Sequence, residues 1–417
     1  MNTSHTHRFS QNGKRMRASE IRELLKLTNR PEVISFAGGL PNPEIFPIEQ
    51  LRTVIQHVMA EHPRDALQYC ATEGHNKLRD AIARGMGRVH DTAQSIHNIM
   101  ITHGSQQALN LLGHILLDPG DVVVMGAPAY LGAVQAFEAF RASIESVPLD
   151  EDGIRVDLLE QKLDSLAKDR RPPKFIYLVP TFQNPSGVTL PLERRRRIYQ
   201  LACEHDVLLI EDDPYGFLRY EGEKVPLIKS LDEQERVLYL SSFSKILAPG
   251  FRIAWMAAPE AIVNKACLAK QAQDLCSNSF AQYCIFEAMY HDFLFPHIEE
   301  IIKFYRRKRD TMLAAMERHF PERARWNRPQ GGLFLWVELP PFVDTRDMFA
   351  KAIANDVAYV VGHAFFPNGG GQNCMRLNFS HASDEMIEEG IERLARVIRE
   401  EIEEKEKKLE DELIGGF

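Results

Sequence analysis

The 417-residue chain contains no apolar run long enough to span a bilayer, and its polar, basic first residues lack the apolar core of a secretory signal. Its formal net charge of −8 offers no basic footprint for nucleic acid or an anionic membrane. None of the six cysteines forms a C-x-x-C pair, and the fifteen histidines form no H-E-x-x-H pattern. We therefore expect a cytoplasmic protein with reduced thiols, no bound metal, and no nucleic-acid or membrane partner.

From about residue 98 the chain alternates short apolar runs with amphipathic segments. Polar residues follow the apolar runs about 30 residues apart, which suits successive βα units of a mostly parallel sheet covered by helices. Ligands of such sheets bind outside the carboxyl ends of the strands. After Arg252 the pattern turns helical. Earlier in the chain, the run Arg194–Arg197 is expected to form the solvated face of a helix. The predicted strands are Asn98–Thr102, Asp121–Met125, Lys174–Val179, Val207–Ile210 and Val237–Leu240.

Lys245 stands just past the last of these strands, in the stretch SSFSKILAPGFR. A lysine becomes a nucleophile when burial or a neighbouring cation lowers its pKa, and Arg252 could supply that cation. Ser242, Ser244 and Arg252 could also hold a phosphate, because hydroxyl and guanidinium groups both donate to its oxygens. A nucleophilic lysine beside a phosphate site suggests a Schiff base to pyridoxal phosphate. Taken alone, the stretch is equally compatible with a surface loop and a solvated lysine.

The other strand ends offer a candidate for each remaining need of that cofactor. Asp212 can place an anion at the pyridine nitrogen, while Asn184 and Tyr215 can donate to the phenolic oxygen. Tyr130 can cover one face of the ring. Individually, Asp212 could instead be a helix N-cap, and Asn184-Pro185 only a turn. The candidates for a phosphate cup are Ser105, Gln106, Ser242, Ser244 and Arg252.

An ordered set of motifs carries a resemblance over most of the chain, from about Arg17 to about residue 400. The chain resembles the fold-type-I pyridoxal-phosphate-dependent aminotransferases of class I/II, and within them the α-aminoadipate/kynurenine aminotransferase group. The resemblance implies an α/β fold with a mostly parallel central sheet, helices on both faces, and a smaller α+β C-terminal domain. It implies an N-terminal arm and helix over 1–45, a large cofactor domain over 46–300 and a small domain over 301–417. The motifs are SEIRELLKLT, SFAGGLPNPEIFP, LQYCATEG, GSQQAL, PAYLGA, PTFQNPSGV, EDDPYG, SSFSKILAPGFRIAW, GGLFLW and MRLNFS.

The resemblance also implies roles at the cofactor. Lys245 looks like the Schiff-base lysine, which then moves a proton between the substrate Cα and C4′ of the cofactor. Asp212 resembles the partner of the pyridinium, and Asn184 and Tyr215 resemble the donors to the phenolate. A tyrosine like Tyr69 reaches the phosphate of the neighbouring subunit's cofactor, which implies an obligate homodimer with shared active sites.

On the substrate side the resemblance implies a further set of contacts. Arg376 resembles the clamp on the α-carboxylate, with Asn184 beside it, and Gly39 resembles a backbone contact to substrate. Arg22 resembles an N-terminal-helix arginine that meets a distal carboxylate. Ser19, the expected N-cap of the same helix, is a further candidate for substrate binding. One departure is Asn278, where relatives often carry proline.

These observations predict transamination between an L-amino acid and a 2-oxo acid, which we expect to be 2-oxoglutarate. The donor range stays open between 2-aminoadipate and a broad acidic, aromatic and branched-chain set. A β-lyase or a decarboxylase with the same cofactor is an alternative, because a fold does not fix a reaction. A pyridoxal-phosphate-binding transcription regulator is a remote alternative, since the roughly 17-residue N-terminal arm is too short for a helix-turn-helix module.

Overall fold

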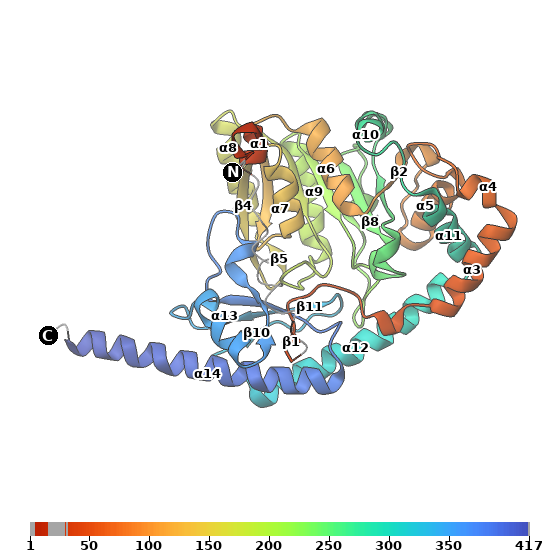
Figure 1. The fold of residues 1–417 in the computed structure, drawn as a ribbon. Helices are drawn as coiled ribbons and strands as arrows, with labels where there is room; N and C mark the ends of the chain where they lie inside the picture. Colours follow the sequence, from red (N-terminus) through yellow and green to blue (C-terminus); the bar gives the residue numbers. More distant parts are fainter. Residues whose placement is uncertain (1–4, 16–29, 31, 416–417) are drawn as a thin grey trace.

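The computed structural model describes residues 5–15, 30 and 32–415 of the chain. Its largest element is an eight-stranded sheet (Figure 1). Four of the seven pairings between neighbouring strands are parallel. The other three are antiparallel: β2 with β9, β9 with β8, and β4 with β5. The mostly parallel sheet expected from the sequence is therefore confirmed. In spatial order the strands are β2 (Ile99–Thr102), β9 (Ala254–Ala257), β8 (Val237–Ser242), β7 (Leu208–Asp212), β6 (Pro173–Leu178), β3 (Val122–Ala127), β4 (Ser143–Asp150) and β5 (Gly153–Ile154).

Helices cover both faces of this sheet because its strands are apolar on both sides. Successive side chains of a strand point to opposite faces, and alternate residues of β6 accordingly enter two different hydrophobic clusters. Phe175 and Tyr177 pack on the side of α6 (Ser105–Leu116) and α7 (Leu131–Glu138). Ile176 and Leu178 pack on the side of α8 (Val156–Lys168) and α9 (Leu192–Glu204).

Two details of the sequence prediction for this region are wrong. Residues 254–257 do not begin a helix: they form β9, which returns antiparallel between β2 and β8 before α10 (Glu260–Gln273) starts. The run Arg194–Arg197 is not wholly solvated, because the Arg195 side chain is fully buried. Its guanidinium donates to the carbonyls of Leu190, Pro226 and Pro180. A buried arginine can be stable there because these carbonyl oxygens replace its water.

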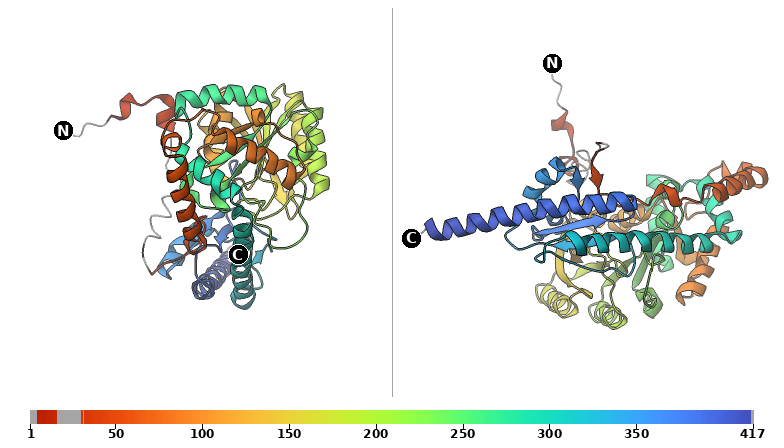
Figure 2. Two further views of the ribbon diagram at one scale, coloured as in Figure 1. Left: turned by 90° about the vertical axis from the view of Figure 1, so that its right-hand side faces the viewer. Right: turned by 90° about the horizontal axis from the view of Figure 1, so that it is seen from below.

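The C-terminal part is a smaller unit with an antiparallel sheet of order β10-β11-β14-β13. The chain reaches this unit through the 26-residue helix α12 (Leu294–His319), which runs continuously through residue 300. The last helix, α14 (Asp384–Gly415), packs along α12 and then extends away from the body (Figures 1 and 2). The division of the chain at residue 301 stays a prediction. Other elements of this unit are β10 (Arg325–Trp326), β11 (Phe334–Glu338), α13 (Thr345–Ala354), β13 (Val360–Val361) and β14 (Cys374–Asn378).

An early segment of the chain joins this C-terminal unit. The short strand β1 (Ile34–Ser35) pairs in parallel with β12 (Val357–Ala358), so residues 36–39 run directly beside the smaller sheet. The backbone N–H of Asn378 donates to the carbonyl of Phe36 over 2.8 Å. These contacts fix the glycine loop after β1 against the C-terminal unit.

A third group of helices lies beyond the β2 edge of the large sheet (Figure 1): α3 (Ile48–Glu61), α4 (Pro63–Ala66), α5 (Asn76–His90) and α11 (Ser279–Tyr290). Asn278, where the family pattern often has proline, is the N-cap of α11. Its side chain accepts a hydrogen bond of 2.8 Å from the N–H of Ala281, a cap that asparagine makes well and proline cannot make. In the part of the chain that the structure describes, no helix is long and apolar enough to cross a membrane.

Candidate active site

The predicted cofactor residues meet where the parallel strands end. Asp212 is the last residue of β7, and Lys245 ends the 3-10 turn Phe243–Lys245 that directly follows β8. Ser242 caps this turn, because its Oγ accepts a 3.0 Å hydrogen bond from the N–H of Ser244. Asn184 lies in the loop after β6. The sheet register places these loops side by side at one edge.

Lys245 reaches from this edge toward the glycine loop. Its Nζ donates to the carbonyl oxygen of Gly39 over 2.9 Å. Desolvation, followed by the nearby charges of Arg376 and Arg252, lowers the pKa of the amine to about 8. Both influences were expected from the sequence, which named Arg252 as the neighbouring cation. An amine with this pKa keeps an unprotonated fraction on the order of a tenth at pH 7.

Asp212 is buried, with 2% of its surface exposed. The hydroxyl of Tyr177 donates to Oδ2 over 2.8 Å, whereas the buried Oδ1 has no hydrogen-bond partner among the described residues. Desolvation raises the pKa of this carboxyl to about 7. Buried polar atoms are rarely left unpaired. The orphaned oxygen therefore fits a ligand that brings its own N–H donor, as a protonated pyridine nitrogen does.

The predicted phosphate cup surrounds the N-terminus of α6. Gly104, at φ +74°, precedes Ser105, and a Cβ at this glycine would collide with the guanidinium of Arg252. Arg252 itself adopts φ 55°, an uncommon left-handed conformation for a residue with a side chain. The Oγ of Ser105 is buried without a partner among the described residues. Free N–H groups, the helix dipole and a guanidinium together favour an anion.

Two further cup residues have local partners. Ser242 donates its hydroxyl to the Oγ of Ser244 over 2.8 Å. The Gln106 side chain donates to the carbonyl of Gly132 over 2.7 Å, which ties the first turn of α6 to that of α7. Tyr130 is the N-cap residue of α7, and burial, followed by the charge of Asp212, raises the pKa of its phenol. Its ring therefore lies within electrostatic reach of Asp212.

Arg376 lies on β14 of the smaller sheet and reaches the glycine loop and Asn184. Its Nη1 donates to Oδ1 of Asn184, and its Nη2 donates to the carbonyls of Ala37 and Gly38, each over 2.9 Å. The guanidinium lies 4.3 Å from the ring centroid of Phe334, and desolvation lowers its pKa to about 10. Nε is buried without a partner among the described residues. These contacts hold a cation between Asn184 and the 37–39 loop, which suits recognition of a carboxylate.

Tyr215 completes this network. The Nδ2 of Asn184 donates to the Tyr215 hydroxyl over 3.4 Å, and burial raises the pKa of that phenol. Tyr69 is separate from the network and is 77% exposed on the loop after α4. Arg22 and Ser19, the two candidates on the N-terminal helix, lie outside the described residues.

The sequence prediction missed two supporting residues. Tyr177 stands in an apolar strand, and nothing in KFIYLV distinguishes a tyrosine that binds Asp212 from one that fills the core. Arg195 fixes the start of the loop that carries Asn184, through Pro180 and the Thr181 hydroxyl. Helix periodicity could have indicated Arg195, because it lies one turn before Ile198 and therefore on the same buried face of α9.

The geometry fits pyridoxal 5′-phosphate: an amine with a lowered pKa, a carboxylate oxygen without a partner and an anion site converge at one strand-end edge.

The chain also matches known proteins. The sequence model of the family described as aminotransferase class I and II matches residues 33–394. The chain is 48% identical over 394 residues to aromatic-amino-acid aminotransferase 1 of Thermococcus litoralis, with 94% of each protein covered.

Two other relatives are named for different activities. The chain is 39% identical over 394 residues to the 2-aminoadipate transaminase of Thermus thermophilus, covering 94% of this chain and 96% of that protein. It is 46% identical to the Pyrococcus horikoshii kynurenine aminotransferase, solved in complex with PMP, KYN as substrates and KYA as products. That superposition has a TM-score of 0.93 and covers 95% of this chain and 98% of the other.

Proposed function

The chain belongs to the class I and II aminotransferases, which are pyridoxal-phosphate enzymes, and from this premise we propose that it moves amino groups from a broad set of L-amino acids to 2-oxoglutarate. The proposed donors include aromatic amino acids and 2-aminoadipate. One observation carries the proposal: Lys245 and Arg376 bind adjacent carbonyls of the same loop, that of Gly39 and those of Ala37 and Gly38. A carboxylate at Arg376 would therefore bring the Cα of an amino acid close to the Lys245 amine.

The proposed roles follow from charge and position. When bound, pyridoxal phosphate supplies an aldehyde for the amino group and a ring that withdraws electrons. Lys245, with its lowered pKa, takes a proton from the substrate Cα and can return it. Asp212 holds the ring nitrogen protonated through its free oxygen, and Tyr177 keeps that carboxylate oriented. Arg376 fixes the α-carboxylate and so orients the Cα–H bond.

The remaining cofactor roles are proposals of the same kind. Ser105, Gln106, Ser242, Ser244 and Arg252 would hold the phosphate, and the geometry at Gly104 supports this because it leaves room only for the Arg252 guanidinium. Asn184 and Tyr215 would donate to the phenolic oxygen, with Tyr130 against the ring.

The donor range is proposed from the relatives' names together with Arg376. The three relatives act, by their names, on aromatic amino acids, 2-aminoadipate and kynurenine. All such donors share the α-carboxylate that Arg376 would bind, and they differ in their side chains. We place recognition of a distal carboxylate at Arg22, with Ser19 as a further contact on that segment and Gly39 as a backbone contact.

A homodimer is also part of the proposal. Tyr69 and Leu67 expose large apolar side chains on one loop, and Leu275 exposes a third. The thiol of Cys70 contacts the carbonyl of Ser277 over 3.6 Å, so the two segments adjoin. An aromatic and apolar patch of this kind is typical of an interface. A cytoplasmic location is proposed from the six cysteines, all of which are free in the structure.

A panel of amino donors, each with 2-oxoglutarate, tests the substrate proposal. We expect glutamate formation from phenylalanine, tyrosine, kynurenine and 2-aminoadipate, measured as kcat/KM for each. Turnover of a single donor class alone would reject the broad range. If the enzyme carries its cofactor but forms no glutamate with any of these donors, the proposed acceptor is rejected.

A further inference from the structure

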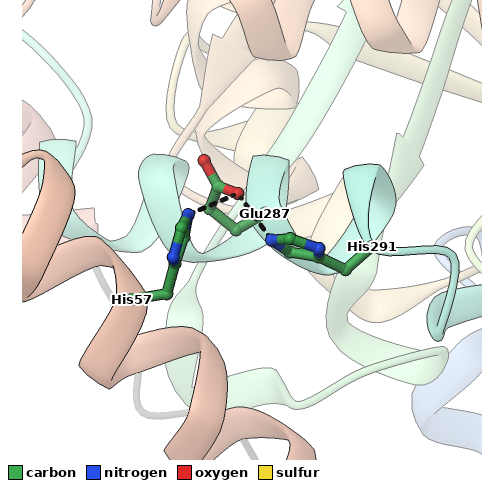
Figure 3. A group of neighbouring side chains, drawn as sticks. All are labelled: His57, Glu287 and His291. Atoms are coloured by element: carbon green, nitrogen blue, oxygen red, sulfur yellow. Dashed lines mark ion pairs between the residues drawn. The ribbon is translucent and has the colours of Figure 1, made fainter.

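The packed helices α3 and α11 lie beyond the β2 edge of the large sheet (Figure 1). Four polar side chains meet at their C-terminal ends. His57 lies in the last turn of α3, and His62 directly follows that helix. Glu287 lies in the last turn of α11, and His291 directly follows it. Figure 3 shows His57, Glu287 and His291 turned toward one another from the two helices.

The two imidazoles in this picture converge on one oxygen. Nε2 of His291 lies 3.2 Å and Nε2 of His57 lies 3.6 Å from Oε2 of Glu287. The three ligand atoms all lie within 4.8 Å of one another. Zinc bonds of about 2.1 Å to nitrogen and oxygen separate tetrahedral ligand atoms by about 3.4 Å. Two of the three separations therefore already suit a shared ion, and small side-chain rotations would close the third.

From this geometry we propose that His57, Glu287 and His291 bind a divalent transition-metal ion of the zinc class. Two imidazoles and one carboxylate form a known zinc ligand set, which leaves a fourth position for water or an anion. This site is separate from the proposed transamination and does not depend on it. The sequence expectation of no metal relied on contiguous motifs, whereas here each helix end contributes part of the set.

The surroundings support a built site. The Glu287 side chain is only 4% exposed, so its charge is largely removed from water and a cation would compensate that cost. Nε2 of His62 lies 3.7 Å from the other carboxylate oxygen, Oε1, which is an ion-pair distance and longer than a hydrogen bond.

An ion can reach the site from solvent. The side chains of His57 and His291 are 40% and 49% exposed. His57 and Glu287 line a surface hollow together with Lys77, Asp80 and Arg84 of α5. Because α3 and α11 are distant in sequence, an ion bound by residues of both helices would cross-link them. It would lie beside the hydrophobic contact of Val54 and Val58 with Cys284, which packs the same two helices.

The test uses the full-length holoenzyme without a histidine tag, treated with chelator, dialysed and titrated with Zn²⁺ by calorimetry. The ligand variants are His57→Gln and His291→Gln, both at exposed side chains, so that folding is retained; circular dichroism and cofactor content verify it. The matched control is the double variant His5→Gln/His7→Gln, which removes two exposed histidines near the N-terminus.

We expect about one Zn²⁺ per chain in the wild type and in the control variant. Each ligand variant should bind at least about tenfold more weakly. Zn²⁺ should also raise the thermal unfolding midpoint of the wild type, because it binds the folded state, and should not raise that of His291→Gln. Equal affinity in the wild type and both ligand variants would overturn the proposal. So would loss of binding in the His5/His7 variant alone, or a wild type that takes up no Zn²⁺.

Discussion

The two sides of the proposed active site are built in different ways. On one side Asp212 ends β7 and Lys245 follows β8, and the pairing of these two neighbouring strands fixes their relative position. On the other side Arg376 belongs to a different sheet and is held by carbonyls of the 37–39 loop and by Asn184. The strand-end side would carry the chemistry that all substrates share. The opposite side, where distant segments meet, would decide which substrates are accepted.

The largest effect should follow loss of the amine on the strand-end side. Lys245→Ala should lower kcat by about 10³-fold or more, since it removes the group that moves the Cα proton. The cofactor should remain bound through its phosphate and ring contacts, as its absorbance would show. Lys303→Ala, at an exposed position on α12, is the control. Near-native turnover of Lys245→Ala would contradict the assignment.

The next effect concerns the anion at the same edge. Asp212→Asn keeps the size of the side chain but removes the charge that would hold the ring nitrogen protonated. We expect kcat to fall on the order of hundreds-fold, comparable to the loss of a strong electrostatic stabiliser. Tyr177→Phe, which deletes only the hydrogen bond to Asp212, should cost about tenfold. Equal losses in the two variants would mean that Tyr177 matters for more than orienting the carboxylate.

On the opposite side, Arg376→Ala should weaken every donor alike. A charge-assisted hydrogen bond contributes about 1.5–3 kcal/mol, which corresponds to roughly ten- to a hundredfold in kcat/KM. The measurement compares phenylalanine with 2-aminoadipate. A loss confined to one donor would show that Arg376 reads the side chain and not the shared α-carboxylate.

Arg22→Ala should act on only one class of donor. If Arg22 meets a distal carboxylate, kcat/KM should fall about ten- to a hundredfold for 2-aminoadipate and glutamate and hardly at all for leucine or phenylalanine. The ratio of the two losses is the readout. A common factor for both classes would assign Arg22 a structural role in its segment.

The smallest effect is one of stability in the cofactor-free protein. Burial raises the pKa of Asp212 to about 7 in the folded state, above its ordinary value of 3.8. The folded state therefore holds the proton more tightly than the unfolded state, and this contribution to stability is lost as the pH rises from about 4 to about 7. Asp212→Asn should remove that loss. Thermal unfolding of the apoenzyme at pH 5 and pH 8 should show the variant gaining on the wild type at pH 8.

The same contrast explains what the sequence could predict. Lys245, Asp212 and Asn184 follow apolar strands at regular spacing, so a local pattern is enough to bring them to one edge. Contacts that depend on tertiary packing are not specified by a local pattern: helix periodicity can place Arg195 on the buried face of α9, but it does not identify the carbonyls that the guanidinium binds. Arg195 was expected to face solvent and is buried against the loop that carries Asn184, while Tyr177 looks like any core tyrosine.

Two larger features were hidden for the same reason. The strand β9 was missed because a four-residue apolar run before a helix has no periodicity of its own. The histidines and the glutamate at α3 and α11 come together only through the packing of two helices that are far apart in sequence. In both cases the information lies in long-range contacts, which a local pattern does not contain.

The central claim is that the residues of this proposed site perform amino transfer rather than lysis or decarboxylation. It is tested most directly by mixing the holoenzyme with excess phenylalanine or 2-aminoadipate and no acceptor, and measuring the products per chain. Transamination predicts one equivalent of the 2-oxo acid per active site, no carbon dioxide, and resumption of turnover only when 2-oxoglutarate is added. Continued product formation without an acceptor, or release of carbon dioxide, would contradict the account.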